Sequence, residues 1–296
     1  MKGQPIRTVA RFLLHKLLPG QLRQIIYTIP YAFFIKSFME KCDVTGDSLF
    51  SYIEIETINR CNGKCEFCPV NVNQRQRPYA KMSTELFHKI VDELSEIGYS
   101  GEIHLFSNNE PLLDERIIAF SEYVKDRVPN AYIMIYTNGT LLTIEKAVAL
   151  CKNIDLLVID NYSSDGSLPA HLLQIKEYSK SDEVLSAKIV IDNKKPDSIL
   201  SSRGGLAPNK KKTTLLGVEK GCIYPYRQMV IRPDGKCSLC CNDALGKYNL
   251  GDVNDDSLLN IWRSKEYQDI RRRMKENGRR ALKLCDACDT HYFDGT

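Results

Sequence analysis

Hydrophobic and polar positions follow two alternating periods along residues 51–192. Short apolar stretches with the two-residue period of a strand alternate with longer stretches in which apolar side chains recur every three to four residues. The strands are expected at 52–57, 102–106, 131–137, 155–160 and 187–192. The helices are expected at 83–98, 113–127, 143–153 and 168–180. This order predicts an α/β fold with a parallel sheet and helices on its outer face, either an open sheet or a partial barrel.

The composition changes after this region. Residues 198–216 are rich in Ser, Gly, Lys and Pro and are expected to form a linker. The tail that follows contains a hairpin with its turn at 233–235 and a helix over 257–278. Its basic run, 271–280, is expected to be a solvated helix end. We therefore expect three parts: an N-terminal helical arm (1–48), an α/β domain (49–205), and a linker with a small cysteine-rich domain (206–296).

The arm carries most of the charge imbalance. Residues 1–41 contain seven Lys or Arg and one acidic residue, whereas the remainder has 34 basic and 36 acidic residues. This distribution gives no general case for nucleic-acid binding, so no nucleic-acid partner is expected. The uncharged run 24–35 is too short to span a bilayer, and Pro30 is expected to interrupt it. Either residues 1–41 contact a membrane surface as an amphipathic helix, or the arm packs as a helical extension on the main domain.

Cysteine use sets the expected compartment. Eight of the eleven cysteines fall in three clusters, at 61–68, 237–241 and 285–288. An odd total with such clustering argues against a disulfide framework and for metal-bound thiolates in a reducing cytoplasm. Cys42 and Cys151, outside the clusters, are expected to be buried thiols, and Trp262 is expected in the core.

The first cluster follows the first predicted strand, where such folds bind their ligands. Cys61, Cys65 and Cys68 supply soft thiolates, which select zinc or an iron–sulfur cluster. A structural zinc site needs a fourth ligand, and neither His88 nor His104 has zinc-finger spacing. Three ligands on a four-iron cluster leave one iron open to a substrate or cofactor.

This loop, with Phe67 before its last cysteine, resembles the defining loop of the radical S-adenosylmethionine (SAM) enzymes. "SNNEPLLD" (107–114) resembles the family's Gly-Gly-Glu-Pro motif, although Asn108 and Asn109 replace the glycines. "YTNGTLL" (136–142) and "VIDNYSSDG" (158–166) are similar to two further SAM-lining segments, and Glu110 stands where the family holds the amino group of SAM. The resemblance implies a partial TIM-like barrel of five or six parallel strands, a SAM-binding four-iron cluster on the triad, and SAM contacts from Phe67, Asn109, Glu110, Thr137, Asn138, Asp160 and Asn161.

The tail resembles the SPASM extension of these enzymes, or its shorter twitch form, which bind auxiliary four-iron clusters. Its six cysteines are too few to close two clusters, so one is expected. The spacing is similar to that of twitch enzymes, among them a sugar-alcohol dehydrogenase, and implies the ligands Cys222, Cys240, Cys285 and Cys288. Cys241 is an alternative to Cys240, because neighbouring side chains in a strand point to opposite faces. A structural zinc site on four of these thiolates is the other interpretation.

The resemblance also implies the reaction. The triad cluster gives an electron to SAM, and the resulting 5′-deoxyadenosyl radical removes a hydrogen atom from the substrate. A carbohydrate-like small molecule is then either dehydrogenated, with an electron passing to the auxiliary cluster, or epimerised by a thiol from Cys237, Cys241 or Cys42. Arg203, in "SSRGG", is a candidate substrate anchor. An external electron donor such as flavodoxin or ferredoxin is expected. Maturation of a ribosomally made peptide and a non-catalytic electron carrier are the alternatives.

Overall fold

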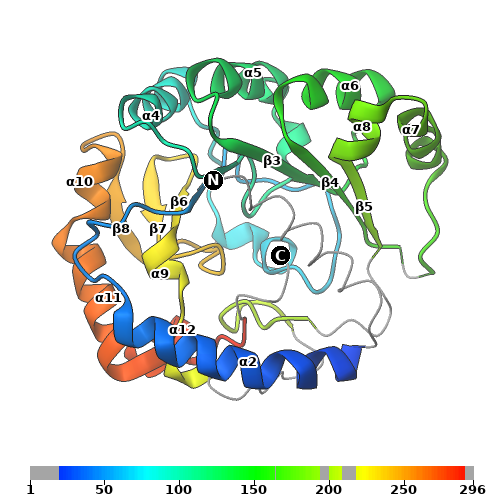
Figure 1. The fold of residues 1–296 in the computed structure, drawn as a ribbon. Helices are drawn as coiled ribbons and strands as arrows, with labels where there is room; N and C mark the ends of the chain where they lie inside the picture. The colour runs from blue at the N-terminus through cyan, green and yellow to red at the C-terminus, as the bar shows by residue number, and fades with distance from the viewer. Residues whose placement is uncertain (1–19, 164, 194–199, 209–217, 291–296) are drawn as a thin grey trace. The chain divides into compact units, whose positions relative to one another are not determined.

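The computed structural model of the protein describes residues 20–163, 165–193, 200–208 and 218–290 (Figure 1). They form two compact units, each assembled from separate stretches of the chain. One, the barrel unit, comprises 43–196 and 224–271; the other, the cysteine unit, comprises 1–42, 197–223 and 272–296. The division into three consecutive domains remains a prediction.

The barrel unit is built on one sheet in the order β5-β4-β3-β2-β1-β6-β7-β8. Its strands are β1 (Tyr52–Ile55), β2 (Glu102–His104), β3 (Tyr132–Thr137), β4 (Leu156–Asn161), β5 (Ile189–Asn193), β6 (Gln228–Ile231), β7 (Lys236–Ser238) and β8 (Asn249–Asp252). Every pairing from β5 to β6 is parallel, whereas β7 and β8 are antiparallel to their neighbours. The mostly parallel sheet confirms the predicted fold class, and its interior strands are buried on both faces, as parallel sheets require.

Helices follow the strands of the barrel unit, and in Figure 1 they line the outer face of its curved sheet. The first, α4 (Thr84–Glu96), shows why the sequence folds this way: the Ser83 hydroxyl accepts a hydrogen bond from the Leu86 N–H, and Phe87 and Ile90 share a buried apolar face. The others in this layer are α5 (Ile117–Arg127), α6 (Ile144–Asn153), α7 (Ala170–Lys180) and α8 (Glu183–Lys188). Short segments between the elements are α3 (Pro69–Val72), η1 (Gln74–Gln76), η2 (Pro111–Leu113) and α9 (Tyr224–Arg227).

The predicted hairpin of the tail forms, but its first strand belongs to the main sheet. β6 pairs in parallel with β1, in register Ile53 to Met229, and then turns antiparallel into β7. The turn needs Gly235, whose φ is 87°. The single helix expected over 257–278 is instead two helices, α10 (Leu258–Trp262) and α11 (Lys265–Asn277), because the Ser264 hydroxyl accepts a hydrogen bond from the Tyr267 N–H and starts a new helix. Trp262 is fully buried, as expected.

In the cysteine unit, α2 (Gly20–Lys41) runs without a break through Pro30, so the predicted interruption is wrong. Past the proline, Ile35 and Met39 are buried, and the Met39 sulfur would lie 2.6 Å from a Cβ placed on Gly221. This packing offsets the hydrogen bond that a proline removes from a helix. The unit also contains η3 (Val218–Lys220), η4 (Gly278–Ala281) and α12 (Lys283–Asp286).

The basic run 271–280 is not uniformly solvated. Arg271 and Arg279 have exposed fractions of 0% and 3%, which corrects the expectation for this segment. Cys42 and Cys151 are buried, as predicted. In the part of the chain that the structure describes, no helix combines the length and apolar character needed to cross a membrane.

Candidate functional site

The cysteine triad lies in the loop between β1 and α3, and α3 begins directly after Cys68. The sulfurs of Cys61 and Cys65 face the same glycine: a Cβ placed on Gly63 would lie 3.3 Å from one and 3.7 Å from the other. The Gly63 N–H also donates to the Cys61 sulfur, at 3.3 Å. Burial raises the pKa of Cys61 to about 11, and the neighbouring Glu110, Cys68 and Cys65 add to the effect. All three thiols are only partly covered, so a group outside the protein can reach them.

Glu110, after β2, joins the ends of two strands. Its side chain is 1% exposed and accepts hydrogen bonds from the Thr137 hydroxyl at 2.7 Å, the Asn138 N–H at 2.8 Å and the Leu112 N–H at 3.0 Å. Burial raises its pKa, and these three bonds oppose the rise. A carboxylate has about four acceptor positions, so about one remains. Glu110 therefore has a structural role, and one acceptor position is left for a ligand. Its contact with the amino group of SAM stays a prediction.

Asn138, after β3, reaches back to the cysteine loop. Its amide nitrogen donates to the Asn62 side chain at 2.9 Å and lies 3.9 Å from the Cys61 sulfur. Asn62 in turn donates to the hydroxyl of Thr140 at 2.8 Å. The segments after β1, β2 and β3 are thus connected side chain to side chain at the carboxyl edge of the sheet.

The segment after β4 also contacts the cysteine loop. The ring of Tyr162 lies 5.2 Å from that of Phe67, between centroids, and its hydroxyl donates to Asp160 at 3.0 Å. The Asn161 amide is used locally, in hydrogen bonds to Ser163, Ser167 and the β5 residue Asn193. The SAM contacts predicted for Asp160 and Asn161 both stay predictions.

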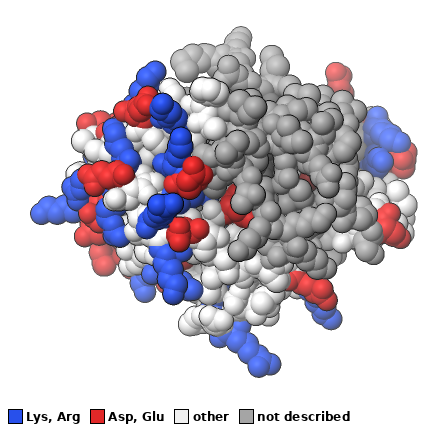
Figure 2. All heavy atoms as spheres, turned by 90° about the horizontal axis from the view of Figure 1, so that it is seen from below, with Lys and Arg blue, Asp and Glu red and all other residues white. Residues whose placement is uncertain are grey.

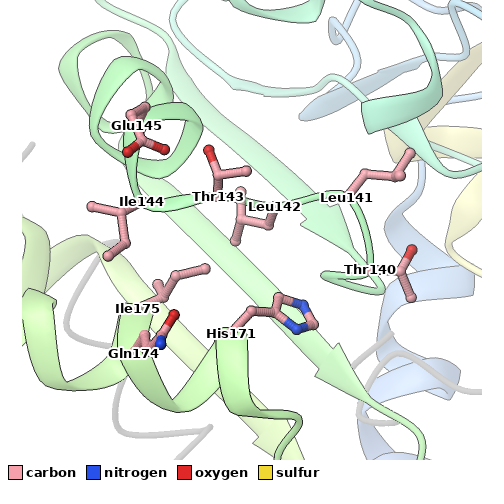
Figure 3. Close-up of a pocket in the computed structure, with 9 residues that line it drawn as sticks. All are labelled: Thr140, Leu141, Leu142, Thr143, Ile144, Glu145, His171, Gln174 and Ile175. Carbon is pink, nitrogen blue, oxygen red and sulfur yellow. The ribbon is translucent and has the colours of Figure 1, made fainter.

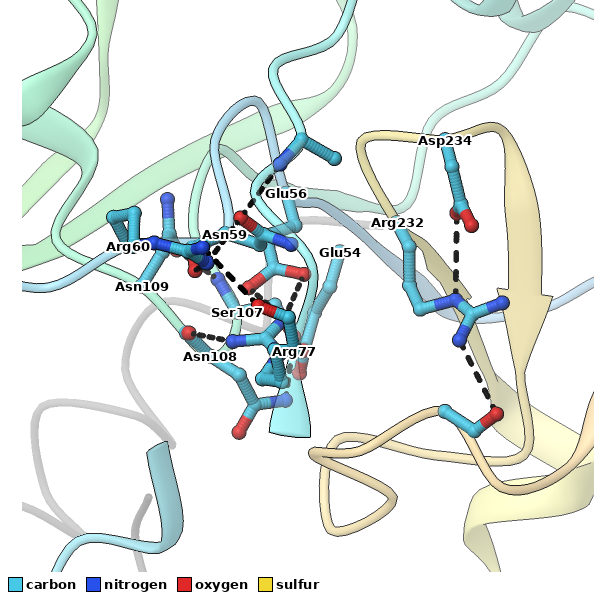
Figure 4. Close-up of polar contacts among 12 residues, drawn as sticks. Glu54, Glu56, Asn59, Arg60, Arg77, Ser107, Asn108, Asn109, Arg232 and Asp234 are labelled. Atoms are coloured by element: carbon cyan, nitrogen blue, oxygen red, sulfur yellow. Dashed lines mark hydrogen bonds and ion pairs between the residues drawn. The ribbon is translucent and has the colours of Figure 1, made fainter. Parts of the chain in front are cut away.

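A buried polar network underlies these loops, and sequence reasoning missed it (Figure 4). Arg77 and Glu56 form a buried ion pair at 2.8 Å, and Arg77 also donates to the Asn108 carbonyl at 2.8 Å. Burial raises the pKa of Glu56, and the charge of Arg77 opposes the rise. Arg77 thus connects the segment after the triad to the end of β1 through the ion pair, and to the motif after β2 through the hydrogen bond. Figure 4 also shows Arg232 beside Asp234 in the hairpin, at 3.5 Å.

Asn108 and Asn109 fit where the related motif has glycines. Arg203 is the non-glycine residue with a positive φ among the described residues, so neither asparagine is strained. The Asn109 Oδ1 accepts from the Ser107 N–H at 2.9 Å, which fixes the amide orientation, and leaves its buried Nδ2 without a hydrogen-bond partner in the described structure.

Two such unpartnered donors show that the site suits added groups. The Nδ2 atoms of Asn71 and Asn109 are both buried without partners among the described residues, and Asn71 lies 3.5 Å from the same Gly63 Cβ position as the sulfurs. Buried donors normally have acceptors, so these two amides could each donate to a bound group. The described residues contain no three Cys, His, Asp or Glu side chains arranged around a single ion. A four-iron cluster spaces its ligands more widely than one ion does.

The cysteine unit brings Arg203 close to two predicted cluster ligands. Arg203 has a φ of 48° in a turn whose Ser202 donates to Asp289 at 2.6 Å and to the Ala287 carbonyl at 2.8 Å. The turn thus lies directly on the segment that carries Cys285 and Cys288. A left-handed arginine costs about 1–3 kcal/mol and persists where packing enforces it, often at functional sites.

Cys222 is partly exposed and belongs to the cysteine unit, whereas Cys237, Cys240 and Cys241 belong to the barrel unit and differ sharply in access. Cys237, on β7, is completely buried, and burial raises its pKa. Cys240 is 7% exposed, whereas Cys241 is partly exposed. Both lie in a bend and turn after β7 rather than in a strand, so the strand-based reason for choosing between them does not apply. The ligand set with Cys240 stays a prediction.

A separate pocket lies on the barrel unit between the loop after β3 and α7 (Figure 3). Residues 140–145 form one wall, and His171, Gln174 and Ile175 form the other. The His171 Nε2 contacts the Gly139 carbonyl at 3.0 Å, so its ring is fixed in place. None of the predicted site residues lines this pocket.

Comparison with known proteins agrees with this geometry. A family model described as "Radical SAM superfamily" matches residues 55–164, and SPASM, described as an "Iron-sulfur cluster-binding domain", matches 222–289. The S-adenosyl-L-methionine-dependent 2-deoxy-scyllo-inosamine dehydrogenase of Niallia circulans is 27% identical over 248 residues, which cover 82% of this chain and 94% of the dehydrogenase.

Solved structures show the same architecture. BtrN in complex with AdoMet and 2-DOIA aligns with a TM-score of 0.70 at 25% identity, over 82% of this chain and 94% of that one. The native anSMEcpe with bound AdoMet aligns with a TM-score of 0.52 at 14% identity, over 74% and 82% of the two chains, and supports the fold alone.

Proposed function

We propose that this chain, which belongs to the radical SAM superfamily and carries an iron–sulfur cluster-binding domain of the SPASM type, oxidises a carbohydrate-like small molecule by dehydrogenation. The observation that carries the proposal is the convergence of four strand ends on the cysteine triad, with the unpartnered buried amide of Asn71 beside its sulfurs. The similarity to a dehydrogenase along 94% of that enzyme's length supports oxidation of an aminocyclitol or related polyol.

The triad and the tail cysteines would hold the groups that supply the radical chemistry. When bound, the cluster on Cys61, Cys65 and Cys68 would supply an electron to SAM, and the auxiliary cluster would accept one from the substrate radical as that radical loses a proton. The Asn71 amide would donate to the first of these clusters, because its nitrogen is buried beside the loop without another acceptor. The protein's own contribution is to bind and orient these groups and the substrate.

SAM would be held by the segments after β2 and β3. The Asn109 nitrogen offers a donor to the SAM carboxylate, and the remaining acceptor position of Glu110 suits its ammonium group. Glu110 also fixes Thr137 and Asn138, so the cofactor-binding backbone is already in place. Preorganisation of this kind lowers the entropic cost of binding.

For the substrate end we propose Arg203, whose permanent charge and planar donors suit the oxygen atoms of a polyol. Its strained conformation is maintained by the hydrogen bonds of Ser202. If the reaction were an epimerisation, Cys241 would be the thiol donor, because Cys237 is sealed in the core and its pKa is raised by burial. We favour dehydrogenation because the similar enzyme is a dehydrogenase.

The setting of the enzyme is part of the proposal. We expect a cytoplasmic protein that receives electrons from a flavodoxin or ferredoxin. The described half of the arm supports a structural role, since Tyr31, Ile35 and Met39 are buried on one side of α2. On the face shown in Figure 2, Lys and Arg are interspersed with Asp and Glu rather than gathered in a basic patch. Membrane contact through residues 1–41 is the untested alternative for the arm, and residues 1–19 lie outside the described residues.

The direct test is a substrate screen under anaerobic conditions. Reconstituted protein, SAM and a chemical reductant are incubated with a panel of aminocyclitols, sugar alcohols and short peptides, and 5′-deoxyadenosine is measured. We expect an aminocyclitol or polyol to raise its formation above the substrate-free rate and to yield a product two hydrogens lighter. Stimulation by peptides alone would contradict the proposed substrate class.

A further inference from the structure

Arg279 is a buried cation in the cysteine unit that the reaction scheme above does not use. It has an exposed fraction of 3% and lies in η4, directly after Gly278. Its Nε donates to the Gly221 carbonyl at 3.0 Å, its Nη1 to the Cys288 carbonyl at 2.8 Å, and its Nη2 to the Thr290 carbonyl. One guanidinium therefore links three separate points of the backbone.

Two of those points adjoin predicted cluster ligands. Gly221 precedes Cys222, and the second carbonyl is that of Cys288 itself. The two segments around Gly278 and Glu219 pack closely. Gly278 has a φ of 60°, and a Cβ there would lie 2.3 Å from the Glu219 carbonyl oxygen, so a larger residue would not fit. The fold thus requires η4 to lie against the segment before Cys222, and it holds the guanidinium there.

A buried positive charge needs a negative partner, and the described residues give Arg279 no carboxylate. Burial works against the charged form, yet the nearby Cys222, Tyr31 and Cys288 raise the pKa of Arg279 above its ordinary value. The natural partners are the two cysteine sulfurs, as the thiolates that a bound cluster requires. Three of its hydrogen bonds go to carbonyls and a further one involves the Tyr31 side chain, so the guanidinium acts on the sulfurs through its charge.

We infer that Arg279 raises the reduction potential of the auxiliary cluster, by placing a permanent positive charge beside Cys222 and Cys288, and so makes the cluster an effective electron acceptor. This inference rests on the proposed function, which requires one electron to leave the substrate for that cluster. Reduction adds one negative charge to the cluster, and a neighbouring cation stabilises the reduced form. No new bond or co-reactant is involved.

The experiment compares two variants of matched size in a background that lacks the SAM cluster. Cys61, Cys65 and Cys68 are changed to Ala, so that the remaining iron belongs to the auxiliary cluster, and its midpoint potential is followed by EPR during a redox titration. Arg279→Lys keeps the charge and Arg279→Gln removes it. We expect Arg279→Gln to disfavour reduction at least tenfold, which is about 59 mV for one electron, and Arg279→Lys to stay near the parent value. Arg116→Gln, an arginine of the barrel unit that donates to the Met82 carbonyl, is the control and should leave the potential unchanged.

Three results would overturn the inference. One is equal potentials for the Lys and Gln variants at full iron content. Another is a rise in potential on loss of the charge. The last is loss of the cluster from both variants, which would make Arg279 a purely structural residue. The redox titration uses neither SAM nor substrate. If the protein oxidised no polyol, that result would count against the proposed function, and the measured potentials would still test the role of Arg279. An iron-free parent would instead refute the auxiliary cluster of the proposed function.

Discussion

The side-chain amide of Asn108 donates a hydrogen bond of 2.9 Å to the backbone carbonyl of Cys241. It joins the motif after β2 (residues 107–114) to the cysteine-containing turn after β7. Asn108 is 6% exposed, so this bond is protected from competing water.

A second route connects the same two places through a buried carboxylate. Glu54 accepts from the Gln228 amide at 2.6 Å and from the Ser107 hydroxyl at 2.6 Å. Gln228 in turn accepts from the Cys241 N–H at 3.1 Å, while Asn108 donates to the Ser107 hydroxyl at 3.3 Å. Both the N–H and the C=O of Cys241 are therefore hydrogen-bonded within one closed network. The position of the turn that contains Cys241 thus depends on Ser107 and Asn108 in the motif after β2.

We expect Asn108→Gly, which restores the residue typical of the related motif, to release this turn. The Cys241 carbonyl would lose its buried donor, at a cost of about 1–3 kcal/mol in the free energy of unfolding. Product formed per 5′-deoxyadenosine should fall, while iron content stays full. Urea unfolding and product analysis check the two effects.

Asn254→Gly is the matched control for that change. Its amide also donates to a backbone carbonyl, that of Asp234 at 3.0 Å, but at the exposed tip of the hairpin. A surface change of this kind should alter stability by no more than about 0.5 kcal/mol. If Asn108→Gly behaves like this control, the network does not position Cys241.

For Glu110→Gln we expect weaker SAM binding with full iron content. The substitution replaces one acceptor oxygen with a donor, although Thr137, Asn138 and Leu112 all donate to this carboxylate. The dissociation constant should rise at least tenfold, which is about 1.4 kcal/mol. Equilibrium binding of SAM measures this. The exposed Glu115→Gln should bind SAM normally, and an unchanged affinity in Glu110→Gln would rule out its proposed role.

The cluster stoichiometry gives a third prediction. Reconstituted protein should contain about eight irons, and the variant with Cys61, Cys65 and Cys68 all changed to Ala should retain about four. Iron and acid-labile sulfide analysis provides the count. A value of about twelve, or zinc in place of the remaining iron, would contradict a single auxiliary cluster.

The regular part of the fold was predictable from sequence because its signals are local. The spacing of apolar side chains predicted the alternating strands and helices from β1 to β5, and the cysteine spacing predicted where the site lies. The pairing of β6 with β1 was not predictable in this way, since Ile53 and Met229 meet only in the folded chain. The break between α10 and α11 did have a local signal in the capping position of Ser264.

Buried charges were the hardest feature to predict. Arg279 lies in a basic run that is typical of a solvated surface, and Arg77 has no motif around it, yet both are almost fully buried. Their partners are backbone carbonyls, the Tyr31 side chain and one distant carboxylate, Glu56. Such partners become visible only once the chain is folded, because they depend on which loops the sheet brings together.

The arm provides a fourth prediction, through two side chains of the same helix. Ile35 is fully buried and Phe33 is 73% exposed, so Ile35→Ala should lower stability by about 2–5 kcal/mol and Phe33→Ala by less than about 0.5 kcal/mol. Thermal unfolding compares the two variants.

We also expect the full-length protein to remain in the supernatant with anionic vesicles at low salt. Salt-sensitive cosedimentation that Phe33→Ala abolishes would instead favour a membrane-surface role.

The most direct test of the proposed dehydrogenation follows a deuterium atom. An aminocyclitol that stimulates SAM cleavage is labelled at its carbinol carbon and converted under single-turnover conditions, in ordinary and in deuterated water. We predict that the label appears in 5′-deoxyadenosine and that the product is a ketone, whose reacting carbon carries no hydrogen and therefore no solvent deuterium. A product of unchanged oxidation state that carries solvent deuterium there, or 5′-deoxyadenosine without the label, would contradict it.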